Sequence, residues 1–333
     1  MKSHDISWPL ESTTVDGTLV VPDGTGPFPA AVLIAGSGPT DRDWNSPFIP
    51  GTNGSARLLA ESLASAGIAS VRYDKRLSGP RAKENVQALM GRLSMQTHLD
   101  EVVSAVETLV REAPIRRDKV FIIGNSEGTL HALHYQSSHP AIPAAGLVLL
   151  APPGRAVGAV ARTQLGAQFA GLPNAAALMG YYDEAMARYA AGQPARPNPA
   201  LPQGALQLFM GLELPLNLPF ARELWLADGA ALLPTTPGPI LVMIGKKDLQ
   251  IDWQLDGHPL EGAARGRTDV TFLYPENANH VFKHDPTPRA ELKMPDAIAK
   301  YSAADAHLDD EAVRGILDWL TARSEAVVHS TPG

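Results

Sequence analysis

The feature that most constrains the fold is a series of short apolar runs separated by helical patterns. Each run is too short for a helix and rich in valine and isoleucine, which indicates a buried strand. The runs cover residues 30–35, 68–73, 120–123, 146–151, 240–245 and 270–274. Helical spacing predicts helices at about 55–66, 97–112, 127–138 and 309–325. Strands and helices that alternate in this way predict a mostly parallel, doubly wound α/β sheet. Residues 14–21 alternate between polar and apolar, so we expect an antiparallel edge strand there.

The alternation stops between Pro152 and Pro239, where helical spacing replaces strand spacing. We interpret this stretch as an inserted helical cap. Closely spaced prolines at 194–202 exclude a helix across that part, so we expect two helical halves. The predicted organisation is a core formed by residues 1–153 and 239–333, with a cap, or lid, at 154–238.

Composition excludes several classes of function. The chain has 333 residues, a net charge of -7, and 35 acidic and 28 basic residues spread along its length. This balance offers no surface for nucleic acid or an anionic membrane, and it disfavours a polyanionic substrate. With no cysteine in the sequence, a hydrolytic nucleophile would be an oxygen. The start lacks a secretory signal, and no apolar stretch approaches the roughly 18 residues of a membrane span, so we predict a soluble, cytoplasmic protein.

Ser126 is the candidate nucleophile. It lies between Gly124 and Gly128 in a Gly-x-Ser-x-Gly pattern that follows an apolar strand and precedes a helical segment. A strand that turns directly into a helix strains the serine, and glycines avoid clashes at the neighbouring positions. The amide of Glu127, at the start of the helix, would point toward a developing oxyanion. A serine that only caps the helix is the alternative.

A serine hydroxyl needs a base, and the base needs an orienting carboxylate. Asp248 follows the strand at 240–245 and His280 follows the strand at 270–274, so both are expected at the carboxyl edge of the sheet. The order Ser126, Asp248, His280 is the one expected for this architecture. The alternatives that stay open are Asp252, Asp256 and Asp285 for the acid and His284 for the base.

A second oxyanion donor is expected from the loop after an early central strand. The loop at 36–39 is rich in glycine and leaves the strand at 30–35, which makes the amide of Ser37 the candidate. A plain turn is the alternative reading of this loop.

Charged residues follow two early strands. Asp41 and Arg42 come after the loop at 36–39, and Asp74 and Arg76 come after the strand at 68–73. Opposite charges on adjacent loops can pair beneath a site. We therefore favour a structural ion-pair network for these four residues over a contact with substrate.

Four motifs, in order, resemble those of bacterial α/β-hydrolases of the esterase and serine aminopeptidase-like type. The loops of that group read G-S-G-P-x-D-R, R-Y-D-K-R, G-x-S-E-G and N-H-x-F, and here they lie at 36–42, 72–76, 124–128 and 279–282. The resemblance implies the α/β-hydrolase fold, the triad of Ser126, Asp248 and His280, and oxyanion amides from Ser37 and Glu127. This sequence departs from the pattern at Asn125, where the group has histidine, and at Leu77, where it has glycine. Both departures bear on the acyl pocket.

These residues predict a serine hydrolase that cleaves small to medium, uncharged carboxylic esters through an acyl-enzyme. We expect a small-molecule ester as the partner, with no cofactor, no metal, no nucleic acid and no membrane. A thioesterase, an amidase or peptidase, or an acyltransferase would use the same triad. A non-catalytic protein that binds a small ligand is the alternative from another class. Large apolar side chains of the cap would contact substrate or form the core of the cap itself, namely Phe209, Met210, Phe220 and Trp225.

Overall fold

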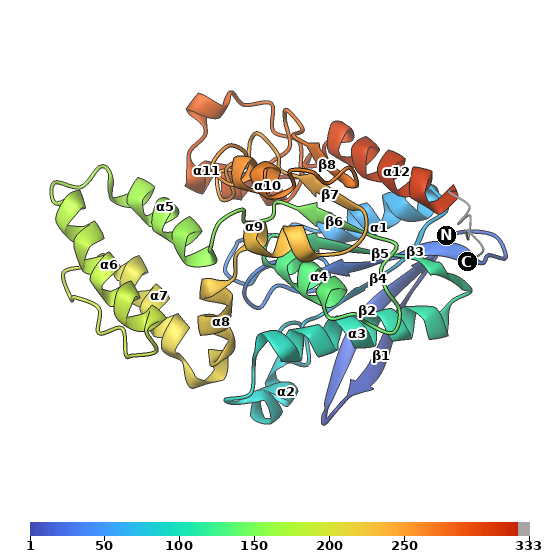
Figure 1. Ribbon diagram of the computed structural model, residues 1–333, viewed down its shortest axis with the longest axis horizontal. Coiled ribbons are helices and arrows are strands. Elements are labelled where there is room, and N and C mark those ends of the chain that lie inside the picture. The colour runs from blue at the N-terminus through green and yellow to red at the C-terminus, as the bar shows by residue number, and fades with distance from the viewer. Residues whose placement is uncertain (326–333) are drawn as a thin grey trace.

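The computed structural model describes residues 1–325, which form one eight-stranded sheet with helices on both faces (Figure 1). The strand order is β1-β2-β4-β3-β5-β6-β7-β8. β1 pairs antiparallel with β2, β2 pairs antiparallel with β4, and all other neighbours are parallel. The strands are β1 (Lys2–Leu10), β2 (Thr13–Val21), β3 (Phe28–Ile34), β4 (Ala69–Tyr73), β5 (Ile115–Asn125), β6 (Gly146–Leu150), β7 (Ile240–Met243) and β8 (Val270–Leu273).

The central strands carry continuous apolar runs because helices cover both faces of the sheet. Every residue of β4, β6 and β7 is buried. In β5, the buried part is the carboxyl half, from Lys119 to Asn125, which enters the middle of the sheet. The predicted mostly parallel, doubly wound α/β sheet is confirmed.

The helices form two layers and a separate group (Figure 1). α1 packs against α12 on one face of the sheet, and α3 packs against α4 on the other. Among residues 1–325, no helix has both the length and the apolar composition needed to cross a bilayer. The helices are α1 (Ser55–Ser65), α2 (Ala82–Leu89), α3 (Met95–Glu112), α4 (Glu127–Ser137), α5 (Val157–Phe169), α6 (Ala175–Ala190), α7 (Gln203–Glu213), α8 (Phe220–Leu226), α9 (Gly229–Leu232), α10 (Gly257–Ala263), α11 (Met294–Ala299) and α12 (Asp310–Glu325).

The edge of the sheet differs from the expectation. The strand predicted at 14–21 is present as β2 and is antiparallel, but β1 covers its outer side, so β1 is the edge strand. Only Trp8 is buried in β1. The first half of β1, from Lys2 to Asp5, is polar and exposed, and the apolar alternation of Ile6, Trp8 and Leu10 covers only its last five residues. So short a signal was not recognised as a strand from the sequence.

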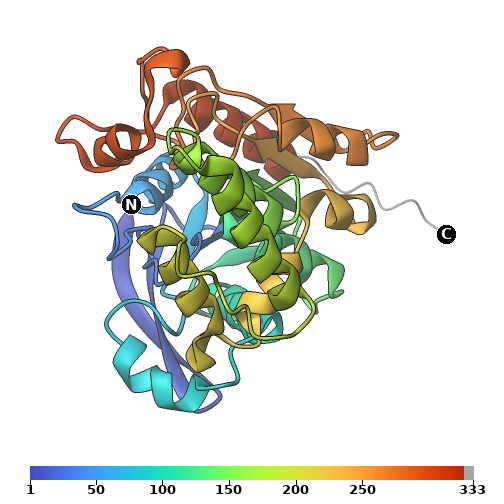
Figure 2. The ribbon, with the colours of Figure 1, turned by 90° about the vertical axis from the view of Figure 1, so that its left-hand side faces the viewer.

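Between β6 and β7, the chain forms helices α5 to α9. Figure 2, in which the left-hand side of Figure 1 faces the viewer, shows α5 to α8 in front of the sheet. No helix spans the proline-rich residues 194–202, as the sequence predicted, so α5 and α6 precede that break and α7 and α8 follow it. The two ends of the stretch that carries α5 to α8 lie side by side, because Ala156 and Asp228 pair there as an isolated antiparallel bridge. We call residues 154–238 the cap segment; these boundaries stay a prediction, and residues 326–333 of the predicted core lie outside the described residues.

The cap segment has its own apolar cluster, separate from the cluster that surrounds the sheet. Phe209 and Trp225 belong to this second cluster, which favours the cap-core interpretation of these two side chains. Met210 is 69% exposed, and Phe220 packs on the rings of two histidines in α3 and α4.

Candidate active site

Ser126 lies at a sharp turn between β5 and α4, with φ of 54° and ψ of -121°. Residues other than glycine rarely adopt a positive φ, so this backbone position is strained. The neighbouring backbones leave no room for side chains on either side. A Cβ on Gly124 would lie 2.3 Å from the carbonyl oxygen of Gly128, and a Cβ on Gly128 would lie 2.6 Å from the carbonyl oxygen of Ile34. These close approaches explain why both positions are glycine.

His280 and Asp248 form a hydrogen bond, with 2.8 Å between Nδ1 and Oδ2. Asp248 is fully buried, and its Oδ1 accepts the amides of Gln250 at 2.7 Å and Ile251 at 3.0 Å. These contacts fix the plane of the carboxylate. A carboxylate at Nδ1 favours the tautomer in which Nδ1 carries the proton, which leaves Nε2 as an acceptor.

The loops after β7 and β8 touch each other, and this contact brings Asp248 to His280. The amide of Lys247 donates to the carbonyl oxygen of Ala278 at 3.1 Å. A Cβ on Gly245 would lie 2.0 Å from the same oxygen, so only glycine fits there. Two loops that follow neighbouring parallel strands thus meet at the carboxyl edge of the sheet.

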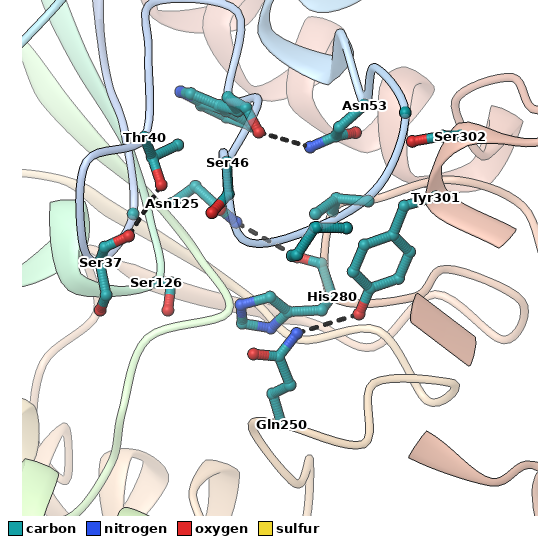
Figure 3. Close-up of a pocket in the computed structure, with 15 residues that line it drawn as sticks. Ser37, Thr40, Ser46, Asn53, Asn125, Ser126, Gln250, His280, Tyr301 and Ser302 are labelled. Atoms are coloured by element: carbon teal, nitrogen blue, oxygen red, sulfur yellow. Dashed lines mark hydrogen bonds between the residues drawn. The ribbon is translucent and has the colours of Figure 1, made fainter. Parts of the chain in front are cut away.

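Ser126 and His280 line the same two cavities, and Figure 3 shows the imidazole of His280 extending toward the hydroxyl of Ser126. The first cavity has a volume of about 140 Å³ and lies toward residues 40–53 and 301–302. The second has a volume of about 230 Å³ and lies under the cap segment, where Val157, Val160 and Leu224 line it. The serine and the histidine therefore face space that a small molecule can occupy.

The two amides predicted as oxyanion donors lie next to the elbow. Ser37 lines both cavities together with Ser126. A Cβ on Gly36 would lie 3.3 Å from the Cβ of Ser126, so the loop after β3 touches the elbow. Glu127 is the first residue of α4, and the first amide of a helix has no acceptor within the helix.

The alternative acids and the alternative base each bind a different partner. Arg289 pairs with Asp252, Arg155 with Asp256, and Lys300 with Asp285. His284 binds Asp309, with 2.9 Å between Nδ1 and Oδ2. Of the residues weighed from the sequence, Asp248 and His280 are therefore the aspartate and the histidine that the structure brings to each other.

The charged residues near the site divide into separate contacts. Arg42 binds Asp74 through Nη2 at 2.7 Å and through its amide at 2.7 Å. Asp41 instead accepts amides within its own loop, including that of Asn45 at 2.9 Å. Arg76 turns toward α3 and binds the buried carboxylate of Glu101, with 3.0 Å between Nε and Oε1. Of the four residues expected in one network, Arg42 and Asp74 alone pair with each other. The backbone of its own loop binds Asp41, and Glu101 and Glu11 bind Arg76.

Two features of the site were not found from the sequence. Asn125, where the resembling group has histidine, donates to the carbonyl oxygen of His280 at 3.2 Å and so ties the elbow to the histidine loop (Figure 3). Beneath the elbow, the carboxylate of Glu127 binds the ammonium of Lys75 at 3.0 Å and the imidazole of His131 at 3.2 Å. In the sequence, only the departure at Asn125 pointed to the contact with the His280 carbonyl. The lysine of the R-Y-D-K-R motif pointed to the contact with Glu127.

Burial shapes the charges of this group beneath the elbow. Burial alone would raise the pKa of Glu127, but the Lys75 charge and the His131 hydrogen bond hold that pKa well below its usual range. Burial lowers the pKa of His131 to about 4, although its hydrogen bond to Glu127 opposes the shift. At neutral pH, Glu127 is therefore a carboxylate and His131 a neutral imidazole.

Residues 1–325 contain no group of three or more histidine, aspartate or glutamate side chains that could hold a metal ion. The side chains that converge at the carboxyl edge are instead a hydroxyl, an imidazole and a carboxylate. This set is suited to nucleophilic attack and proton transfer.

The strand order, the strained turn after β5 and the helices inserted after β6 are those of an α/β-hydrolase. A sequence comparison agrees with the geometry. The chain belongs to the alpha/beta hydrolase family, whose model matches residues 31–293.

Among individual proteins, the chain is 30% identical to esterase EstD of Thermotoga maritima over 149 residues. This match covers 45% of this chain and 33% of EstD, so it spans about a third of the length of that relative. Two solved structures share the fold. Proline iminopeptidase of Mycobacterium smegmatis has 15% identity and a TM-score of 0.56, with 96% of this chain and 99% of that chain covered. Est1E from Butyrivibrio proteoclasticus has 13% identity and a TM-score of 0.54, with the same coverage.

Proposed function

We propose that this chain is a serine hydrolase that cleaves carboxylic esters, with Ser126 as nucleophile, His280 as general base and Asp248 as the orienting acid. One observation carries the proposal: an imidazole bound to a buried carboxylate shares two cavities with a serine held at a strained turn. The name of EstD supports an ester as the substrate rather than an amide or a thioester.

The proposed reaction has two halves. Oγ of Ser126 forms a bond to the carbonyl carbon while Nε2 of His280 takes the hydroxyl proton, and the carbonyl oxygen becomes an oxyanion that accepts the amides of Ser37 and Glu127. The bond to the alcohol then breaks, and the alcohol leaves with the proton from His280. Water attacks the acyl-enzyme with His280 again as base, and the acid leaves as Ser126 regains its proton.

The cavities support a small to medium, uncharged ester. Their volumes of about 140 Å³ and 230 Å³ leave room on both sides of Ser126, so the acyl group and the alcohol can occupy one each. Among residues 1–325, Glu127 is the one residue of the Asp, Glu, Lys and Arg types that lines these two cavities, and Lys75 binds its carboxylate. A charged substrate would find no free opposite charge there.

The test is the hydrolysis of p-nitrophenyl butyrate by Ser126→Ala and His280→Ala. We expect each substitution to lower kcat/KM by at least about a thousandfold, with an unchanged melting temperature. His284→Ala is the matched control, because His284 also binds an aspartate but lies outside both cavities. Full activity in either of the first two variants would remove that residue from its role.

Two further measurements distinguish the alternatives. A fluorophosphonate probe is expected to form an adduct at Ser126, whereas a protein that only binds ligands would stay unlabelled. Rates on a matched ester, thioester and amide with the same acyl group are expected to rank the ester first. If the thioester or the amide is hydrolysed faster, the proposed triad stands and the proposed substrate class changes.

A further inference from the structure

The buried ammonium of Lys75 bridges the two segments that carry the proposed oxyanion amides. Its side chain is 5% exposed. Nζ donates to the carbonyl oxygen of Gly36 at 2.6 Å and to Oε1 of Glu127 at 3.0 Å. The first partner belongs to the loop after β3, and the second begins α4. One cation thus holds two elements that are far apart in the sequence.

The bond to Gly36 fixes the orientation of the Ser37 amide. The carbonyl of Gly36 and the N–H of Ser37 belong to one peptide group, which is planar and trans. In a trans peptide group, the C=O and the N–H point in opposite directions. A donor that holds the Gly36 oxygen on one side therefore aims the Ser37 N–H toward the other side, and Ser37 lines both cavities. The charge of Lys75 also polarises this peptide group, which strengthens its N–H as a donor.

The bond to Glu127 fixes the start of α4. The carboxylate of Glu127 is held between Lys75 and His131, and all three side chains are buried. The amide of Glu127 directly follows the strained Ser126. A residue whose side chain is anchored on two sides has little freedom to rotate its backbone, so the direction of this N–H is fixed as well.

Stability alone gives a weak reason for such a pair. Burial removes water from both charges, and a buried ion pair is often no more stable than apolar residues of similar volume. The geometry around Lys75 indicates a positional role, because the same ammonium binds one group behind each proposed donor.

We propose that Lys75 is a positioning residue of the oxyanion hole, which sets the amides of Ser37 and Glu127 relative to each other. This inference rests on the proposed function, since it assigns a role within the same site. Without the ammonium, the two amides would no longer point correctly at the tetrahedral intermediate. The cavities that bind the ester would stay in place.

The test compares Lys75→Met/Glu127→Gln with Glu127→Gln alone. Lys75→Met alone would leave the buried carboxylate of Glu127 without a counter-charge and would destabilise the protein. Glu127→Gln removes that carboxylate. Relative to Glu127→Gln, we expect the double variant to show a kcat for p-nitrophenyl butyrate that is about 10-fold to 100-fold lower, with KM within about threefold. The affinity for an alkyl trifluoromethyl ketone, which forms a tetrahedral adduct with the serine, is expected to fall by the same factor as kcat.

Two further variants keep the test decisive. Lys75→Gln/Glu127→Gln has a neutral side chain one atom shorter than lysine and carries the same expectation, should the methionine variant not fold. Lys119→Met is the control. Lys119, in the middle of β5, is also buried, and it donates to the backbone carbonyl oxygen of Arg323 at 2.7 Å. The control substitution is expected to lower the melting temperature without changing kcat.

The outcomes separate this inference from the proposed function. An active wild-type protein whose Lys75 variants keep the kcat and the ketone affinity of Glu127→Gln would overturn the role of Lys75 alone. A folded wild-type protein with no hydrolysis that depends on Ser126 would overturn the proposed function, and the role of Lys75 with it.

Discussion

Nδ1 of His280 lies 2.8 Å from Oδ2 of Asp248, and no part of the aspartate side chain is exposed to solvent. The aspartate also accepts two backbone amides of the loop that follows it. Because the carboxylate is fixed from both sides, it can hold the imidazole in one tautomer and one orientation. The first prediction follows from this contact.

Asp248→Asn keeps the shape of the side chain but replaces the acceptor at Nδ1 by an amide that can donate. The wrong tautomer of His280 is then favoured, and Nε2 no longer accepts the serine proton. We expect kcat for p-nitrophenyl butyrate to fall by about 10³-fold to 10⁴-fold, with the fold retained by circular dichroism. Asp252→Asn, a loop acid that pairs with Arg289, is the matched control and is expected to stay active. The reverse ranking of the two variants would reassign the acid.

Gly128→Ala is expected to damage both stability and rate. The added Cβ would lie 2.6 Å from the carbonyl oxygen of Ile34, in a central strand that cannot move easily. We expect the free energy of unfolding to fall by about 1–3 kcal/mol and kcat to fall at least about tenfold, as the elbow shifts. Gly180→Ala is the matched control, because a Cβ there meets no atom of residues 1–325 within 4 Å apart from its chain neighbours and the backbone of its own helix. Because Gly180 lies in helix α6, alanine there is expected to raise the free energy of unfolding by at most about 1 kcal/mol. Urea unfolding measures the free energy of unfolding of both variants, and equal values would contradict the steric argument.

His131 makes stability depend on pH. Burial lowers its pKa from 6.5 to about 4, opposed by the hydrogen bond to Glu127 and helped by the charge of Lys75. As pH falls, the unfolded chain takes up this proton before the folded chain does. The stability from His131 is therefore complete above about pH 6.5 and is lost as pH falls toward 4, with a slope of up to about 1.4 kcal/mol per pH unit. Unfolding free energies at several pH values between 7 and 4 measure this slope. We expect His131→Gln to reduce it, and an unchanged slope would exclude His131 as the source.

The sequence predicted most of the central sheet because buried parallel strands carry a strong signal. The runs at 120–123 and 240–245 lie within or around β5 and β7. The same logic predicted that Asp248 and His280 lie at one edge, since both follow such strands. β1 was missed because its first half is polar and its apolar alternation covers only Ile6, Trp8 and Leu10. Helix α2 was missed because it is short and buries only Asn85 and Leu89.

Contacts between distant side chains could not be predicted. Arg76 was expected near Arg42 and Asp74, yet it binds Glu101, a carboxylate of α3 that nothing in its local sequence marks as buried. The bond from Asn125 to the His280 carbonyl likewise depends on how two loops pack against each other. Periodicity predicts which face of an element is apolar, but the partner of a polar side chain depends on the final packing of the fold.

The bridge between Ala156 and Asp228 gives the inserted helices a single point of departure and return. Many apolar side chains beyond that point pack on a cluster of their own, whereas Phe220 and Val160 pack on the core. A replacement of different length or shape that keeps these core contacts can therefore be accepted there without any change in strand order or in the turn that holds Ser126. Under the proposed function, the residues that select the molecule and those that break its bond can then change largely independently over evolutionary time.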